Sequence, residues 1–181
     1  MKALFLDIDG VLNGHEYDDE AKSCNIRREC VKHLNRVVRE TGCRIVLSSA
    51  WRYIVHGGDM TLRGFGYMLR THGLVTEVGA MRLIVGLTRK DDESVDPKDL
   101  KRDERARQCI DWVTEWNREQ WRLEREAGPT APLPDLVGRY AAVDDEDHEF
   151  DKLNIPFVQT DGKRGPTEAD ADKLIDLLGR T

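Results

Sequence analysis

The sequence predicts an α/β fold with three layers, in which a mostly parallel sheet of five strands lies between helices. Short apolar runs alternate along the chain with longer segments whose apolar residues recur at helical spacing. The apolar runs are continuous, as expected for strands that are buried on both faces of a parallel sheet. The chain has 181 residues, a length suited to one domain, and we expect a single domain over 1–181.

The first half of the chain is predicted to form two strands and two helices. The run Ala3–Leu6 predicts the first strand, and the segment 43–47 predicts the second. Between them, apolar residues at helical spacing indicate a helix over 27–40, which ends at Gly42. The spacing of apolar residues predicts a further helix over 62–69.

The second half is predicted to form three more strands and two more helices. Strands are expected at 83–85 and 140–143, with a long helix over 105–127 between them. The run 155–158 predicts an edge strand, because it contains a proline, which an edge tolerates. Thr167 is expected to cap a last helix, with four apolar residues facing the core: Leu174, Ile175, Leu177 and Leu178.

The charge balance limits the classes of partner. Acidic residues outnumber basic ones, 34 against 28, and give a formal net charge of −6. This balance argues against a generic cationic binder of nucleic acids or membranes. No apolar stretch approaches the ~18 residues of a membrane span, so we expect a cytoplasmic protein without membrane contact. Four cysteines without a C-x-x-C pair are expected to be reduced thiols: Cys24, Cys30, Cys43 and Cys109.

Polar side chains follow three of the predicted strands at the point where each strand ends. They are the pairs Asp7 and Asp9, Ser48 and Ser49, and Asp144 and Asp145, after the first, second and fourth strands. In an open parallel sheet these strand ends share one edge, where such folds bind ligands. Four carboxylates at one edge repel one another unless a cation lies among them, and oxygen ligands suit Mg²⁺ better than Zn²⁺.

This arrangement predicts phosphoryl transfer. A carboxylate beside Mg²⁺, such as that of Asp7, can attack a phosphoryl group, and Asp9 can protonate the leaving oxygen. A hydroxyl such as that of Ser48, together with a fixed cation, would hold the remaining phosphoryl oxygens. A calcium-binding loop is the alternative for the two aspartates, but such a loop needs a third acid where Val11 stands.

Three segments carry a resemblance to a known superfamily. Residues 7–13, Asp-Ile-Asp-Gly-Val-Leu-Asn, resemble the first motif of the haloacid dehalogenase-like (HAD) phosphohydrolases. Residues 45–52 resemble the second motif, and residues 143–145 resemble the paired-acid form of the fourth. Within this superfamily the chain is most similar to the HAD domain of Swiss Army Knife RNA repair proteins, with the phosphatase domain of polynucleotide kinase-phosphatase as a related match. The S-S-x-W-R pattern ending at Arg52 and the segment 107–112 carry this closer likeness.

The resemblance implies a Rossmann-like HAD fold, Mg²⁺ as the cofactor and an aspartyl-phosphate intermediate. Asp7 would be the nucleophile, and Asp9 would be the general acid and then the base for the hydrolytic water. The metal would be held by Asp7, by the backbone carbonyl of Asp9 and by Asp145, with Asp144 beside it.

The resemblance also implies a set of phosphate-binding residues. Ser48 would bind the transferring phosphoryl group, with Ser49 as the competing hydroxyl, and Arg52 is either a substrate contact or a helix-surface residue. The third-motif cation is assigned to Arg107, with three competing positions: Lys101, Arg102 and Arg105. The spacing of the motifs leaves no room for a full cap domain, so a capless or minimally capped site is implied, open to large substrates.

These expectations define a Mg²⁺-dependent phosphomonoester hydrolase that acts on a nucleic-acid 3′-phosphate end or a nucleotide. One alternative is a small-metabolite phosphatase of the same superfamily, as a homodimer that roofs the site; another is a non-catalytic module that binds phosphate or protein. A nucleic acid could meet a basic patch drawn from seven residues: Arg63, Arg70, Arg89, Lys90, Lys98, Lys101 and Arg102. The tryptophans of the long helix are expected in core or interface packing: Trp112, Trp116 and Trp121.

Overall fold

The chain folds around a five-stranded parallel sheet, which confirms the predicted fold class. The computed structural model describes residues 1–14, 26–74, 83–89, 103–128 and 133–180. The strands are β1 (Lys2–Leu6), β2 (Arg44–Leu47), β3 (Ile84–Leu87), β4 (Arg139–Asp144) and β5 (Phe157–Gln159). Their order in the sheet is β3-β2-β1-β4-β5, so β1 is central and β5 lies at an edge, as the proline before it predicts.

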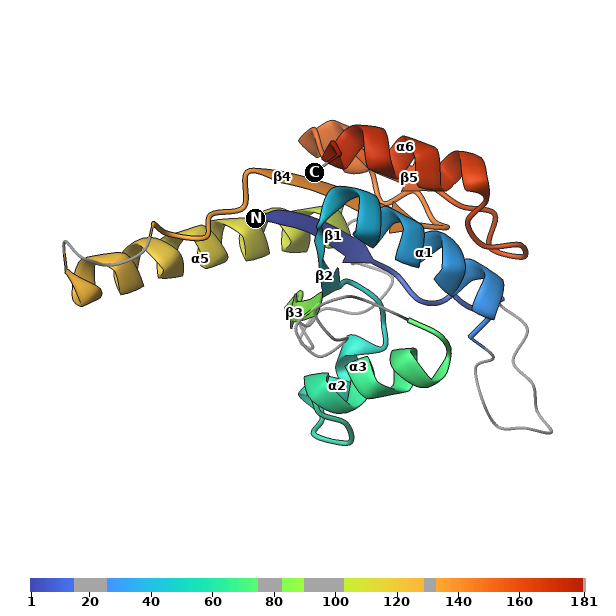
Figure 1. Cartoon of the computed structure of the whole chain (residues 1–181), viewed down its shortest axis with the longest axis horizontal. Coiled ribbons are helices and arrows are strands. Elements are labelled where there is room, and N and C mark those ends of the chain that lie inside the picture. Colours follow the sequence, from blue (N-terminus) through green and yellow to red (C-terminus); the bar gives the residue numbers. More distant parts are fainter. Residues whose placement is uncertain (15–25, 75–82, 90–102, 129–132, 181) are drawn as a thin grey trace.

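Helices cover both faces of the sheet (Figure 1), which gives the expected three layers. The helices of one face are α1 (Arg28–Thr41), α3 (Leu62–Thr71) and α6 (Glu168–Leu178). The opposite face is covered by α5 (Glu104–Ala127). Alternate strand residues divide between the two cores: Leu4 and Leu6 pack on the α1 side, and Ala3 and Phe5 pack on the α5 side.

Two short elements were not expected from the sequence pattern. The helix α2 (Arg52–His56) follows β2 almost directly, and a 3-10 turn, η1 (Phe150–Leu153), precedes β5. Both have fewer than two turns of helix, so neither shows a periodic apolar pattern that could be detected in the sequence. The short helix α2 nevertheless holds the chain that leaves β2, and it carries one of the predicted site residues.

The last helix starts where its cap predicts, but one side chain is misassigned. Thr167 accepts a hydrogen bond from the Asp170 N–H, and the Asp170 carboxylate accepts one from the Thr167 N–H, a complete capping box. Leu174, Ile175 and Leu178 are buried as predicted, whereas Leu177 is 38% exposed. At 100° per residue Leu177 lies roughly 100° around the helix from the centre of the other three, so the prediction for it was wrong.

Two of the three tryptophans of α5 pack as expected. The Trp112 ring meets Phe5 edge-on with centroids 5.9 Å apart and stacks on Trp116 at 5.2 Å. Trp121 is 46% exposed and does not pack in the core, so for this residue only the expected interface packing remains a prediction.

Some expectations fall outside the described residues. Of the cysteines, Cys30, Cys43 and Cys109 are buried free thiols, as expected, while Cys24 belongs to the segment 15–25. The basic residues of 90–102 are outside the described residues as well. Because the segments 15–25 and 75–82 are also outside, the open, capless site and the single domain remain predictions. Among the helices of the described part, none combines the length and apolar character needed to span a membrane.

Candidate active site

The loop that leaves β1 turns sharply and is fixed by its own backbone. The Ile8 carbonyl accepts hydrogen bonds from three successive N–H groups, those of residues 11–13. Gly10 has φ +71°, in the left-handed region that glycine adopts without steric cost. A Cβ atom at Gly10 would lie 2.2 Å from the carboxyl carbon of Asp145, so the turn also makes room for that acid.

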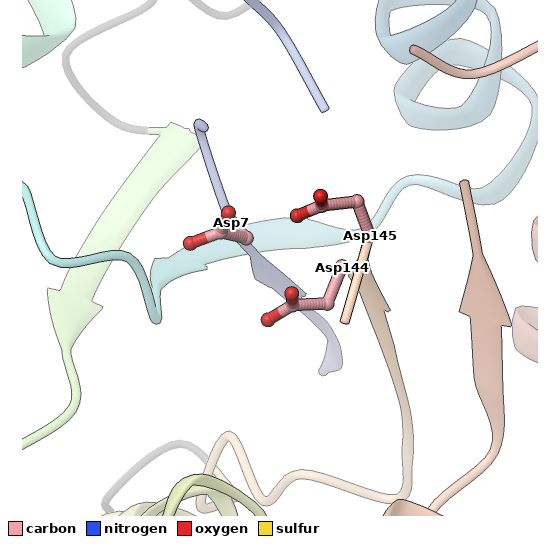
Figure 2. A group of neighbouring side chains, drawn as sticks. All are labelled: Asp7, Asp144 and Asp145. Carbon is pink, nitrogen blue, oxygen red and sulfur yellow. The ribbon is translucent and has the colours of Figure 1, made fainter. Parts of the chain in front are cut away.

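Three aspartates gather where β1 and β4 end. Asp7, Asp144 and Asp145 each offer a carboxylate oxygen, and these oxygens lie within 4.8 Å of one another (Figure 2). Asp7 is 6% exposed and Asp144 only 3%. Burial raises the pKa of Asp7 from 3.8 to about 7, and the charges of Asp144 and Asp9 add to the rise, while Arg105 and the Ser49 hydroxyl oppose it.

This cluster fits a divalent cation with hard ligands. All of its donors are carboxylate oxygens, which suit Mg²⁺, and the glycine that faces Asp145 leaves the space that a side chain would fill. Burial first, and then the charge of Asp144, raises the pKa of Asp7, so its ionised form is disfavoured unless a cation lies beside it. Asp7, Asp144 and Asp145 could therefore hold a metal ion, as the sequence predicts.

Strand alternation decides which acids face α5. Ala3 and Phe5 point to that side, so Asp7, two residues on, points there as well, and Asp144 follows Ala142 in the same way. The helix begins at this edge of the sheet, and its first turn therefore lies over the acid cluster.

The cation of the site is Arg105, in the first turn of α5. Its Nη1 donates to Asp7 Oδ1 at 3.0 Å and to the Ser48 carbonyl at 2.6 Å, and lies 3.4 Å from Asp144 Oδ2. Burial alone would lower the pKa of this guanidinium, but the charges of Asp144 and Asp7 outweigh burial and raise it. Arg105 therefore stays charged beside the carboxylates.

The structure corrects the assignment of the third-motif cation to Arg107. That guanidinium is bound to Asp103, four residues earlier, and the side chain is 48% exposed. Two residues correspond to 200° around a helix, so Arg107 and Arg105 lie on opposite sides of α5. A sequence signal for Arg105 exists: it shares a helical face with Cys109, Trp112 and Trp116 at spacings of four, three and four.

The two serines after β2 have different partners. The hydroxyl of Ser49 lies close enough to the Asp7 carboxylate to lower its pKa and accepts a hydrogen bond from the Trp51 N–H at 3.3 Å, whereas the Ser48 Oγ lies 3.8 Å from the Cys109 Sγ in α5. Ser48 contributes its backbone carbonyl to Arg105 instead. The structure thus places the Ser49 hydroxyl beside Asp7 and turns that of Ser48 toward the helix.

Arg52 is buried, so it is not a helix-surface residue. It is 1% exposed, and its guanidinium donates to the backbone carbonyls of Ser49 at 2.9 Å and Arg89 at 3.1 Å. These bonds tie the loop after β2 to the loop after β3. Its role in the described structure is to hold Ser48 and Ser49 in position.

The Asp9 carboxylate is not a member of the acid cluster and has its own hydrogen-bond donors. Trp51 Nε1 lies 3.1 Å from both of its carboxylate oxygens, and the Asn13 side-chain amide donates to Oδ1 at 2.8 Å. Any contribution of Asp9 to a metal would therefore come through its backbone carbonyl, as the resemblance implies. Sequence reasoning assigned no role to Trp51 or Asn13, although both lie inside the segments that carry the resemblance.

Sheet order and site together define a class of protein. A central β1 that ends in Asp-x-Asp, hydroxyls after β2, a cation at the start of α5 and paired acids after β4 are the arrangement of the HAD superfamily. The family described as the HAD domain in Swiss Army Knife RNA repair proteins matches residues 3–171, and the chain belongs to this family. No curated protein and no solved structure matches the chain.

Proposed function

We propose that the protein is a Mg²⁺-dependent phosphomonoester hydrolase that works through a phosphorylated Asp7. One observation carries the proposal: a buried Asp7 carboxylate lies among two further carboxylates and 3.0 Å from the Arg105 guanidinium. An anionic nucleophile that attacks a phosphoryl group needs positive charge around it, because the reaction brings two anions together. Arg105 supplies one such charge, and a cation held by the three carboxylates would supply another.

Asp7, Asp144 and Asp145 would hold the Mg²⁺ ion. When bound, the ion neutralises part of the carboxylate charge and polarises a phosphoryl oxygen. Arg105 supplies a second positive charge on the α5 side of Asp7. Its bond to the Ser48 carbonyl fixes the guanidinium, so little reorganisation is needed when a phosphate arrives.

In the first step an oxygen of Asp7 attacks the phosphorus, and the bond between phosphorus and the leaving oxygen breaks. A protonated Asp9 gives its proton to the leaving oxygen, so the product departs as an alcohol. In the second step Asp9 accepts a proton from water as the water oxygen attacks the phosphorus, the bond between phosphorus and the Asp7 oxygen breaks, and inorganic phosphate and the free Asp7 carboxylate result.

The favoured substrate is a nucleic-acid 3′-phosphate end or a nucleotide. The support for this choice is the family to which the chain belongs, whose description names RNA repair proteins. Fold and family do not by themselves fix a substrate, so the choice needs a direct comparison of substrates.

Substitution of the nucleophile tests the mechanism. Asp7→Asn removes the attacking carboxylate but keeps its size, and we expect hydrolysis of 4-nitrophenyl phosphate to fall to background with an unchanged circular dichroism spectrum. Asp176→Asn, at an exposed position of α6, is the matched control and keeps full activity. With 4-nitrophenyl phosphate, whose leaving group needs no proton, Asp9→Asn slows only the second step, so phosphorylated Asp7 should accumulate and be detected by mass spectrometry. Normal turnover by Asp7→Asn disproves the mechanism.

Substrate class is tested with the wild-type enzyme and Mg²⁺. We expect a higher kcat/KM for a 3′-phosphorylated oligonucleotide than for the 5′-phosphorylated oligonucleotide, a mononucleotide or a sugar phosphate. A preference for the sugar phosphate would favour the small-metabolite alternative and leave the aspartyl-phosphate mechanism intact.

A further inference from the structure

A basic hollow of about 430 Å³ lies between α1 and the C-terminal end of α3. Four basic side chains and one acid contribute to its lining: Arg28, Lys32, Arg70, His72 and Glu29. We propose that this hollow binds the phosphodiester backbone of a single nucleic-acid strand whose phosphorylated end enters the active site. The proposal rests on the proposed function and adds a surface that the active-site motifs do not include.

The charge of the hollow differs from that of the whole chain. The net charge of the chain is −6, yet three permanently charged cations meet one carboxylate here. Lys32 lies 3.6 Å from Glu29, and both side chains are so exposed that solvent screens this pair. Within the described part of the chain, Arg28 and Arg70 have no carboxylate partner. These cations can therefore meet an anionic ligand without first breaking an ion pair.

The basic patch expected from the sequence coincides only in part with this hollow. Of its described members, Arg70 lines the hollow, but Arg89 is paired with Glu104 and Asp111 at 3.4 and 3.0 Å. Arg28 and Lys32 replace the missing charges. They are four residues apart on α1, so one helical turn separates them on the same face.

Both walls of the hollow are anchored to the active-site loops. The Arg27 N–H, one residue before α1, donates to the Leu12 carbonyl at 2.8 Å, which places the start of α1 against the loop that carries Asp9. On the other side, the Trp51 ring that bonds to Asp9 meets Phe65 of α3 edge-on, with centroids 6.2 Å apart.

The two walls are also tied to each other. The Asn35 amide of α1 donates to the Gly73 carbonyl, at the end of α3, at 2.9 Å. Figure 1 shows that α1 begins at the side of the sheet toward which β1 points, the side of the acid cluster. The hollow and the acid cluster therefore lie toward the same end of the sheet, the hollow on the α1 face and Asp7 facing α5.

Phosphodiester is the ligand that this chemistry favours. A nucleic-acid strand carries one negative charge per nucleotide, so its charges recur along the chain as the cations recur along the hollow. Arginine binds phosphate through paired N–H groups, and two of the three permanent cations are arginines. The same molecule must present a phosphomonoester to Asp7, which an acidic peptide without phosphate does not.

Removal of the three cations tests the proposal. The variant Arg28→Ala/Lys32→Ala/Arg70→Ala should lower kcat/KM for a 3′-phosphorylated single-stranded oligonucleotide by about tenfold or more at low salt. Hydrolysis of 4-nitrophenyl phosphate should stay unchanged, because that substrate does not reach the hollow. In fluorescence anisotropy, the steepness of log affinity against log salt concentration should decrease by about 2, because each of the three lost cations contributes about 0.7 on a single strand.

A matched variant separates the hollow from general charge. Arg118→Ala/Arg122→Ala/Arg125→Ala removes the same charge from exposed positions of α5 and should leave oligonucleotide binding unchanged. An oligonucleotide affinity that is unaltered in the first variant, or equally reduced in the α5 variant, overturns the proposal. Competition by poly-glutamate as strong as that by an oligonucleotide of equal charge overturns the choice of ligand. If the wild type does not hydrolyse 4-nitrophenyl phosphate, the proposed function is rejected. The anisotropy measurement still shows whether the hollow binds the oligonucleotide.

Discussion

Nη1 of Arg105 lies 3.0 Å from Oδ1 of Asp7, and the ion pair joins the first turn of α5 to the end of β1. The two residues are 98 positions apart in the chain. Because the same nitrogen lies 3.4 Å from Asp144, one guanidinium contacts two of the three clustered acids. A fixed positive charge in this position can stabilise both the carboxylates at rest and the phosphoryl group during transfer.

Substitution of Arg105 should therefore reduce catalysis strongly. We expect Arg105→Ala to lower kcat for 4-nitrophenyl phosphate by about 10²–10³-fold, the effect of removing one preorganised donor from a transition state. Arg105→Lys should recover part of the rate, since it restores the charge without the paired N–H groups. Arg107→Ala, which removes an exposed guanidinium bound to Asp103, is the control and should stay within about twofold of wild type. A larger effect for Arg107 than for Arg105 would contradict the assignment.

The pKa of Asp7 predicts how stability depends on pH and Mg²⁺. Its pKa is about 7 in the folded chain, against 3.8 for an ordinary aspartate, so the folded state holds a proton that the unfolded state has lost between these values. In metal-free protein the contribution of Asp7 to stability should therefore fall as pH rises from about 4 to 7 and then level off. The melting temperature, measured with EDTA, should be more strongly pH-dependent in wild type than in Asp7→Asn.

Added Mg²⁺ should stabilise the folded protein mainly at pH values at which Asp7 is ionised. A cation bound by the carboxylates competes with the proton, so added Mg²⁺ should raise the melting temperature more at pH 8 than at pH 5. Asp7→Asn should lose most of this rise. An equal Mg²⁺ effect at the two pH values, or an unchanged effect in the variant, would show that the ion binds elsewhere.

Gly10 should tolerate no side chain. An alanine Cβ would lie 2.2 Å from the Asp145 carboxyl carbon, and the residue has φ +71°, which costs an L-residue about 1–2 kcal/mol. Gly58→Ala is the matched control, because Gly58 has φ +88° but no atom within 4 Å of the place that an alanine methyl group would take. Both variants should lose stability in thermal unfolding, and only Gly10→Ala should also lose Mg²⁺ affinity and activity. Equal behaviour of the two variants would mean that Asp145 has no part in the site.

The strands of the sheet and the position of the acids that follow them could be predicted from the pattern of apolar residues in the sequence. Buried parallel strands are short continuous apolar runs, so the order of residues alone places the side chains that follow them at one edge of the sheet. Asp7, Asp144 and Asp145 meet there as predicted, whereas the carboxylate of Asp9, expected with them, is bonded to Trp51 and Asn13 instead. The choice of hydroxyl was harder: Ser48 continues the alternation of β2, but the chain turns after it, and Ser49 reaches Asp7 instead.

The outcomes for Arg107 and Arg52 show that residue spacing within one segment does not reveal contacts with residues far away in the chain. Arg107 fits a short motif, but the helix that carries it turns 100° per residue, and only the long-range contact with β1 selects Arg105. The Arg52 guanidinium donates to the nearby Ser49 carbonyl and also to the Arg89 carbonyl, which lies 37 residues away in the chain. Both outcomes depend on tertiary neighbours: the helical face of Arg105 can be read from the sequence, but its contact with Asp7 and that of Arg52 with Arg89 cannot.

The bond between Trp51 and Asp9 gives the last prediction. Trp51 Nε1 lies 3.1 Å from both oxygens of Asp9, so loss of the indole N–H should leave the proposed general acid less well oriented. In Trp51→Phe, kcat/KM should fall about 10–100-fold for an alkyl phosphate, whose leaving oxygen needs a proton, as part of the 10²–10⁴-fold that acid catalysis supplies. It should change little for 4-nitrophenyl phosphate, whose nitrophenolate leaves without one.

The ratio of these two effects separates orientation from folding. The value of kcat/KM reports on steps up to and including phosphoryl transfer, so the later hydrolysis of phosphorylated Asp7 does not enter the comparison. Trp121→Phe, at a half-exposed position far along α5, is the control and should alter neither substrate. Because the Trp51 ring also packs against Phe65, a merely structural role would lower both rates alike. An equal fall for the alkyl and the aryl substrate would therefore assign Trp51 to packing and remove it from the positioning of Asp9.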